Sequence, residues 1–139
     1  MFSPPRWDYD PYETCPMPKC ILLVDDNASI RRMLRTVFED TSGWEVCGEA
    51  ENGRQAIEKA GELKPDLIVL DLSMPIMNGL EAGPVLRQML PAVPIILFTL
   101  HGDKFLEREA LSAGVTAVIS KDANVTTLVN EAQELLSAA

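Results

Sequence analysis

The sequence predicts a doubly wound α/β fold, in which a five-stranded parallel sheet is covered by helices on both faces. Short apolar runs alternate along the chain with segments that have the 3.6-residue period of a helix. Several runs are apolar at every position, which is typical of parallel strands buried on both faces. With 139 residues, 47% of them hydrophobic and 24% charged, the chain is expected to form one globular domain.

The first three strands and two helices are predicted in the first half of the chain. Strands are expected at 20–24, 45–50 and 67–70, since each is a short run with apolar residues at strand spacing. A helix over 28–40 ends at the Ser42-Gly43 break, and a second helix begins after Gly53 and stops at Lys64-Pro65. The residues expected to be buried on these helices are Ile30, Met33, Leu34, Val37, Phe38, Ala56, Ile57, Ala60 and Leu63.

Two strands and three helices are predicted in the second half. Strands are expected at 94–99 and 117–120, and helices at roughly 80–90, 103–113 and 124–137. Proline is tolerated only in the first turn of a helix, so Gly83-Pro84 predicts that the third helix either starts late, near 81, or is kinked. The last helix has the clearest period, and its apolar stripe is Val125, Leu128, Val129, Ala132, Leu135 and Leu136.

The N-terminal segment and the cysteines are interpreted together with the cellular location of the protein. Residues 1–19 are rich in proline and are predicted to be a flexible N-terminal tail ahead of a domain over 20–139. A docking segment for a partner is the alternative interpretation of this tail. No apolar stretch of signal-peptide or transmembrane length is found, so a cytoplasmic location with no membrane contact is expected. The three cysteines, which do not form a CxxC pair, are then expected to be reduced thiols: Cys15, Cys20 and Cys47.

The charge of the chain excludes one class of partner. A formal net charge of −9 does not suit direct binding of nucleic acid, because phosphate backbones need a basic surface. It is compatible with a divalent cation or a basic protein patch as the partner.

Polar residues end four of the predicted strands. Asp25 and Asp26 follow the first strand, Asp71 the third, Thr99 the fourth and Lys121 the fifth. Each residue alone has an ordinary explanation as a helix cap, a turn or a solvated side chain. Because the carboxyl ends of parallel strands share one edge, however, all five side chains are expected at the rim where ligands bind in such folds.

Three carboxylates at one rim predict a bound cation. Two unit charges 4 Å apart repel by about 4 kcal/mol at an effective dielectric constant of 20, so a cation would relieve the pocket. Oxygen ligands without a His/Cys cluster favour Mg²⁺ over zinc. The metal would let one carboxylate attack a phosphoryl donor, while the Thr99 hydroxyl and the Lys121 ammonium bind the phosphoryl oxygens.

Residues 71–79, DLSMPIMNG, fit the pattern D-x-x-M-P-x-x-x-G. Together with VDD at 24–26, the strand-end threonine and the strand-end lysine, this motif makes residues 20–138 resemble a response-regulator receiver domain of two-component signalling. The resemblance implies the flavodoxin-like (βα)5 arrangement with strand order 2-1-3-4-5, which sets the first and third strands side by side.

The resemblance also implies a role for each site residue. Asp71 is the expected phosphoacceptor, and Asp25 and Asp26 are the expected Mg²⁺ ligands, one of them acting partly through water. Asp71 and the backbone carbonyl of Ser73 complete the expected metal site. Lys121 is expected to pair with Asp71 and then with its phosphate, and Thr99 to close onto the phosphoryl group.

The expected function is a phosphorylation-dependent switch and not an enzyme, although a receiver assists its own phosphorylation and dephosphorylation. A sensor histidine kinase or a phosphotransfer protein would supply the phosphoryl group, and a downstream protein would read the altered conformation. The altered conformation could also act through a homodimer that forms at the helix 4–strand 5–helix 5 face. Lys121-Asp122 and TLH at 99–101 are more similar to the nitrate-regulator-like branch, whose usual DNA-binding effector is not found here, so the chain is interpreted as a stand-alone receiver or a fragment.

The sequence departs from the receiver pattern at a few positions. Val118 stands where an aromatic residue usually couples the threonine to the output face, and valine is small and stiff. Leu100 is bulky where small residues are common, and is expected to narrow access to the phosphoryl group. Ser73 and His101 flank the site and, with Leu100, are predicted to set the lifetime of the phosphorylated form.

Three other functions fit the sequence less well. A Mg²⁺-dependent phosphohydrolase would usually carry its nucleophile as D-x-D on the first strand, and no second general acid is visible here. A docking module that works without phosphorylation would have no need for the five intact site residues. A flavin or nucleotide domain is disfavoured because the two aspartates would repel its phosphates.

Overall fold

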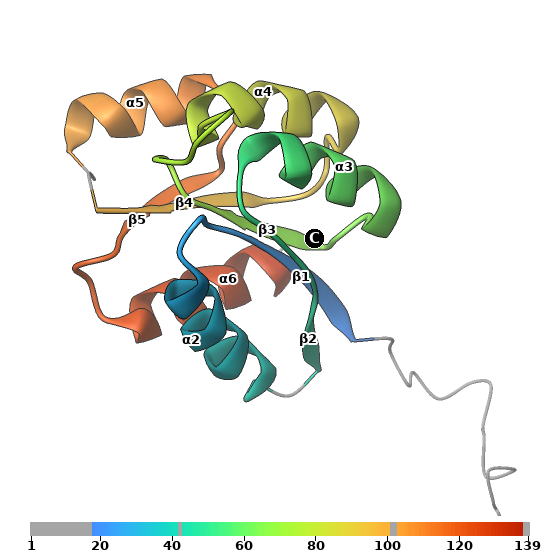
Figure 1. The fold of residues 1–139 in the computed structure, drawn as a ribbon. Helices are drawn as coiled ribbons and strands as arrows, with labels where there is room; N and C mark the ends of the chain where they lie inside the picture. The colour runs from blue at the N-terminus through green and yellow to red at the C-terminus, as the bar shows by residue number, and fades with distance from the viewer. Residues whose placement is uncertain (1–17, 42, 101–102, 138–139) are drawn as a thin grey trace, which may run out of the picture.

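Figure 1 shows the computed structural model, which describes residues 18–41, 43–100 and 103–137. Five parallel strands form one sheet in the order β2-β1-β3-β4-β5, so the predicted fold class and strand order are confirmed. The elements, in chain order, are β1 (Lys19–Val24), α2 (Ala28–Glu39), β2 (Trp44–Ala50), α3 (Gly53–Leu63), β3 (Leu67–Leu70), α4 (Gly79–Met89), β4 (Ile95–Thr99), α5 (Lys104–Ser112), β5 (Ala117–Ser120) and α6 (Val125–Ser137).

The helices form one layer on each side of the sheet. Helices α2 and α6 cover one face, and α3, α4 and α5 cover the other (Figure 1). Alternate side chains of each strand enter opposite cores: Ile21 and Leu23 of β1 pack towards α2 and α6, whereas Leu22 and Val24 pack on the other face. Every residue of β3 and β4 is buried, as expected for central strands covered on both sides.

Each of four helices begins at a polar cap that the sequence supplies. The side chain of Asn27 accepts hydrogen bonds at the start of α2, and Asn52, Asn78 and Asp103 do the same for α3, α4 and α5. At α4 the cap is reciprocal, because the Glu81 side chain also accepts a hydrogen bond from the Asn78 N–H.

Three predictions about the helices need correction. Helix α4 begins at Gly79 and contains Pro84, so a late start near 81 is wrong, and the alternative of a kink stays a prediction. Met33 and Leu63, expected in the buried stripes, are 41% and 38% exposed. Met33 lies about 100° around the helix from the buried Leu34, and Leu63 is the last residue of α3, so each is at the margin of its buried stripe. The stripe of α6 is confirmed, with Leu128, Ala132 and Leu136 buried.

The expectation of reduced thiols is wrong for two of the three cysteines. Cys20 of β1 and Cys47 of β2 form a disulfide, with Cα atoms 5.4 Å apart. The pairing register shifts between Ile21 and Leu22, so Cys47 is an extra residue of β2 that faces the same side as Cys20. Cys15 and the predicted tail up to residue 17 lie outside the described residues, and Lys19 already belongs to β1. Within the described part, no helix has the length and apolar character needed to cross a membrane.

Candidate functional site

Hydrogen bonds that continue the sheet beyond its strands position the site. Asp25 donates its N–H to the last carbonyl of β2 at 3.0 Å, and Asp71 donates to the last carbonyl of β1 at 2.9 Å. Lys121 donates its N–H to the Thr99 carbonyl of β4 at 2.8 Å. The pairing that joins parallel strands therefore also sets Asp25 beside Asp71, and Lys121 beside Thr99.

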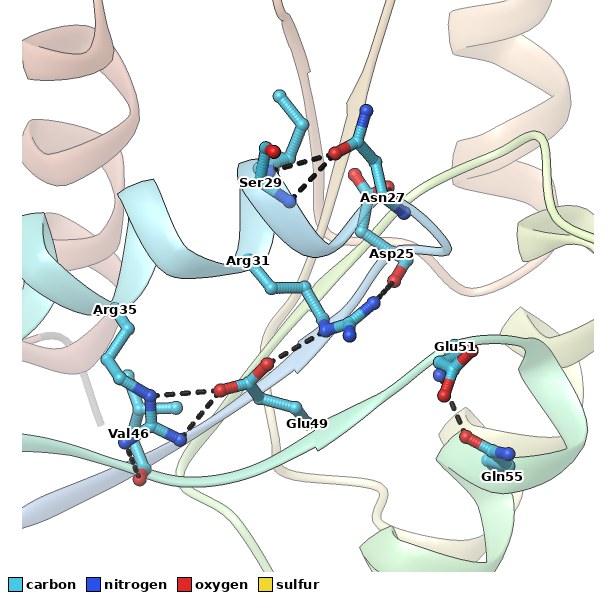
Figure 2. A network of polar contacts seen from close by, with 10 residues as sticks. Asp25, Asn27, Ser29, Arg31, Arg35, Val46, Glu49, Glu51 and Gln55 are labelled. Atoms are coloured by element: carbon cyan, nitrogen blue, oxygen red, sulfur yellow. Dashed lines mark hydrogen bonds and ion pairs between the residues drawn. The ribbon is translucent and has the colours of Figure 1, made fainter.

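Asp25 is held at each of its polar groups. Its carboxylate accepts hydrogen bonds from the Asn27 N–H at 2.9 Å and from Lys121 Nζ at 2.8 Å. Its backbone carbonyl accepts a hydrogen bond from Arg31 Nη1 at 2.6 Å, as Figure 2 shows. The residue is 3% exposed, so its carboxylate has a single well-defined orientation.

The Lys121 ammonium lies between two buried carboxylates. Its Nζ is 2.8 Å from Asp25 Oδ2, 3.2 Å from Asp71 Oδ1 and 5.9 Å from the centre of the Phe98 ring. The contact between Lys121 and Asp71 is therefore present, and the shorter contact to Asp25 was not predicted. Such charge-assisted contacts in a shielded pocket are stronger than the same contacts at an exposed surface.

The charges of the pocket are strongly coupled. Burial and the neighbouring Asp25 raise the pKa of the Asp71 carboxyl above its ordinary value, although Lys121 opposes this shift. Burial lowers the pKa of Lys121, but the hydrogen bond to Asp25 and the charges of both aspartates outweigh burial and raise it. Because the charged form of Asp71 is disfavoured, a further cation in the pocket would stabilise it.

One pocket of about 300 Å³ brings together most of the residues that the sequence singled out. Thr99 is 1% exposed at its floor, whereas Leu100 is 59% exposed at its rim. Asp26 and Ser73 are also exposed. The residues that line it are Asp25, Asp26, Asn27, Asp71, Ser73, Thr99, Leu100 and Lys121.

Two residues named as modulators are not placed in this pocket. Val118 is half-buried on β5 and packs against the core beneath α4 and α5. His101 lies outside the described residues.

The three carboxylates suit a hard divalent cation. One carboxylate oxygen from each of Asp25, Asp26 and Asp71 lies within 4.8 Å of the others, which is close enough for a shared ion. Ligands of this kind, next to an opening that admits water, fit Mg²⁺, which keeps several waters when it binds to proteins. We therefore assign this group as a candidate magnesium site.

Two residues of the segment between β3 and α4 have special backbone requirements. A Cβ atom at Gly79 would collide with the backbone carbonyl of Asp71, so only glycine allows α4 to begin this close to the site. Ile76, in the same loop, has a φ of 70° and is 76% exposed. A β-branched residue in the left-handed region is strained, and its exposed side chain recovers little by burial.

We expect Ile76→Asn to raise the free energy of unfolding by about 1 kcal/mol, because the left-handed conformation costs most L-residues about 1–2 kcal/mol and asparagine tolerates it. Urea unfolding of the two proteins measures the change. Ile76→Ala removes the exposed apolar side chain but keeps a Cβ atom, so it is expected to gain less. Equal stabilisation by Asn and Ala would mean that strain is not the cause.

The sequence did not identify two residues that contact Asp25. Asn27 both caps α2 and lines the pocket. Arg31 lies within the predicted helix over 28–40, where nothing in the sequence marks it as part of the site. Its partner Glu49 lies on a different strand, and no local pattern in the sequence connects them.

Comparisons with known proteins agree with this geometry. The family model for the response regulator receiver domain matches residues 21–133. The chemotaxis protein CheY of Thermotoga maritima is 42% identical over 105 residues, which cover 76% of this chain and 87% of that protein. The transcriptional regulatory protein LnrK of Bacillus subtilis is 34% identical over 109 residues, which cover 78% of this chain but only 50% of LnrK.

A solved structure supports the same assignment. A LuxR-family two-component response regulator from Aurantimonas sp. SI85-9A1 superimposes with a TM-score of 0.83 at 30% identity, covering 87% of this chain and 86% of that one. The relatives include both chemotaxis and transcriptional regulators, so the nitrate-regulator-like branch stays a prediction. By sequence, fold and site geometry, the chain belongs to the family of response regulator receiver domains of two-component systems.

Proposed function

We propose that the chain is a phosphorylation-dependent signalling switch whose phosphoacceptor is Asp71. The observation that carries this proposal is the position of Asp71 in the pocket. Its carboxylate is 3.2 Å from the Lys121 ammonium, beside Asp25 and Asp26 and above the buried Thr99. This arrangement supplies a nucleophile, a cation-binding group and two groups that can bind a phosphoryl oxygen.

The side chains divide the work between attack and recognition. Asp25, Asp26, Asp71 and the Ser73 carbonyl would hold Mg²⁺. When bound, the ion would neutralise charge between the incoming phosphoryl group and the carboxylates. Asp71 Oδ attacks phosphorus as the bond to the donor's leaving group breaks, giving an aspartyl phosphate. Lys121 then exchanges its contact with the carboxylate for one with the new phosphate.

The signal would reach other proteins through a change in shape. The Thr99 hydroxyl closes onto the phosphate, and this movement shifts the packing around Val118 on β5. Valine is too small and stiff to swing inward as the aromatic residue usual at this position does, so the change in packing carries the signal instead. The donor would be a sensor histidine kinase or a phosphotransfer protein in the cytoplasm, and the reader a downstream protein. This output would include a homodimer through the face formed by α5, β5 and α6, which are the fourth helix, the fifth strand and the fifth helix of the chain.

Intact mass spectrometry tests the proposal. The protein is incubated with Mg²⁺ and an acyl phosphate, and then weighed with and without mild base. We expect one base-labile phosphoryl group per chain, none without Mg²⁺ and none in Asp71→Asn. Asp122→Asn is the matched control, because it removes an exposed carboxylate next to Lys121 that does not line the pocket.

Two results would contradict the proposal. Steady hydrolysis of a phosphomonoester, without accumulation of the adduct, would favour a phosphohydrolase. Absence of an adduct with every acyl phosphate and phosphohistidine donor would favour a docking module that works without phosphorylation.

Leu100 gives a further prediction about the lifetime of the adduct. Leu100 is 59% exposed and lines the pocket, and we infer that its side chain limits the approach of water to Asp71. We expect Leu100→Ala to speed dephosphorylation about threefold, which corresponds to less than 1 kcal/mol on the barrier. The decay of the adduct is followed by mass after the donor is removed. Leu111→Ala, at an exposed leucine of α5 outside the pocket, is expected to decay like the wild type, and an unchanged rate in Leu100→Ala would refute the access argument.

A further inference from the structure

Arg31 lies outside the pocket but contacts the backbone of the pocket. Its Nη1 donates to the Asp25 carbonyl at 2.6 Å, and its Nε donates to Glu49 Oε1 at 2.8 Å (Figure 2). The side chain is only 14% exposed. One guanidinium therefore links Asp25, the residue that follows β1, to the edge strand β2.

Glu49 is a fixed anchor for this link. Its second oxygen accepts a hydrogen bond from Arg35 Nε at 2.9 Å and forms an ion pair with Arg35 Nη2 at 2.8 Å (Figure 2). Burial raises the pKa of Glu49, but the hydrogen bonds and charges of Arg31 and Arg35 outweigh it, so the pKa lies below its ordinary value. Glu49 therefore stays ionised near neutral pH, and the position of Arg31 is set from both sides.

We propose that Arg31 is a positioning residue that presets Asp25 for cation binding. A single methylene group joins the Asp25 carboxylate to the main chain that Arg31 contacts, so a shift of that carbonyl would turn the carboxylate away from Asp26 and Asp71. This inference rests on the proposed function, because it assumes that the acidic pocket binds Mg²⁺. In metal sites, mutation of a residue that contacts and orients a metal ligand typically lowers the metal affinity about 10- to 100-fold.

The charge of Arg31 makes the proposal distinguishable from plain electrostatics. A positive charge near the pocket repels Mg²⁺, so its removal alone would tighten binding. Loss of positioning would instead weaken binding. The two effects have opposite signs, and the sign of the change identifies which one dominates.

The test is Mg²⁺ binding to the unphosphorylated full chain, measured by isothermal titration calorimetry at a temperature where every variant is folded. We expect the Kd to rise about tenfold in Arg31→Met and several-fold in Arg31→Lys, since lysine keeps the charge but lacks the fork that reaches two acceptors. Arg32→Met removes an exposed charge from the same helix, and Arg35→Met removes the other partner of Glu49. Both are expected to stay within about twofold of the wild type, because neither contacts Asp25.

Each outcome decides between stated alternatives. Wild-type affinity or tighter binding in Arg31→Met overturns the inference and leaves the proposed function intact. Equal weakening in Arg31→Met and Arg35→Met would make Arg31 a general tie between α2 and β2, which also overturns it. If Arg31→Met does not fold, Arg31→Lys decides, with unchanged affinity counting against positioning. A wild type that binds no Mg²⁺ would instead refute the metal site of the proposed function.

Discussion

Lys121→Met is expected to lower the free energy of unfolding of the metal-free protein by about 3 kcal/mol, because it leaves two shielded carboxylates without their counter-ion. The Lys121 side chain is 13% exposed, and those of Asp25 and Asp71 are 4% and 8% exposed, so solvent screens these contacts weakly. Methionine has a similar length and keeps the packing, so the loss measures the charge. Urea unfolding in the presence of a chelator gives the value.

The same variant is expected to bind Mg²⁺ about tenfold more tightly, because Lys121 competes with a cation for the Asp25 carboxylate. Mg²⁺ should therefore restore part of its lost stability, as any ligand of the folded state does. Lys104→Met, at an exposed lysine of α5, serves as the control and should change neither quantity. A Lys121→Met protein that is as stable as the wild type without metal would show that the ion pairs contribute little.

The dependence on pH follows from the direction of the lysine shift. The folded state holds the pKa of Lys121 above its ordinary value, so the folded protein binds this proton more tightly than the unfolded chain. The stability from the charged lysine is fully present below its ordinary pKa and is lost as the pH rises through the higher folded pKa. The difference between the wild type and Lys121→Met should therefore persist as the pH rises from neutral and shrink under strongly alkaline conditions.

The sheet and the rim of the pocket were accessible from the sequence because both follow from simple periodicity. Strands such as 67–70 are apolar throughout, and a parallel arrangement places the residues after each strand on one edge. Asp25, Asp71 and Lys121 come together for this reason alone, before any detail of packing is known. The order of the strands came from the resemblance to receivers and not from the pattern of residues.

Contacts between elements that are distant in the chain were not accessible in this way. Arg31 and Glu49 meet across α2 and β2, and neither residue stands out in its own segment. Met33 and Leu63 have the right spacing to be buried, yet exposure at the edge of a helix depends on the reach of its neighbours. The start of α4 at Gly79 depends on the reciprocal cap between Asn78 and Glu81, whereas the alternative of a late start near 81 followed from Pro84 alone.

For Cys20 and Cys47, the cellular compartment and the geometry of the sheet lead to opposite expectations about the thiols. The absence of a secretory signal favoured free thiols, since disulfides are rare in a reducing cytoplasm. The pairing of β1 with β2, however, sets Cys20 and Cys47 on the same face of neighbouring strands, with Cα atoms 5.4 Å apart. That separation lies within the range that a disulfide requires.

Reduction of this disulfide is expected to lower the free energy of unfolding by about 3.5 kcal/mol, the chain-entropy value for a bridge that closes a loop of this length. The two cysteines are 27 residues apart, and the bridge joins the edge strand β2 to β1. Urea unfolding with and without a thiol reductant measures the change, and hydrogen exchange should show the largest loss of protection along β2.

Substitution of single cysteines separates the bridge from other effects of the reductant. Cys47→Ser should unfold like the reduced wild type and show no response to reductant, whereas Cys15→Ser should keep the full response. A response that persists in Cys47→Ser would assign the effect to a different cysteine pair. A wild type with equal stability in both conditions would mean that the sheet hydrogen bonds alone hold β2 in place. Because β2 also carries Glu49, the anchor of Arg31, the same experiment shows whether this side of the acidic pocket depends on the bridge.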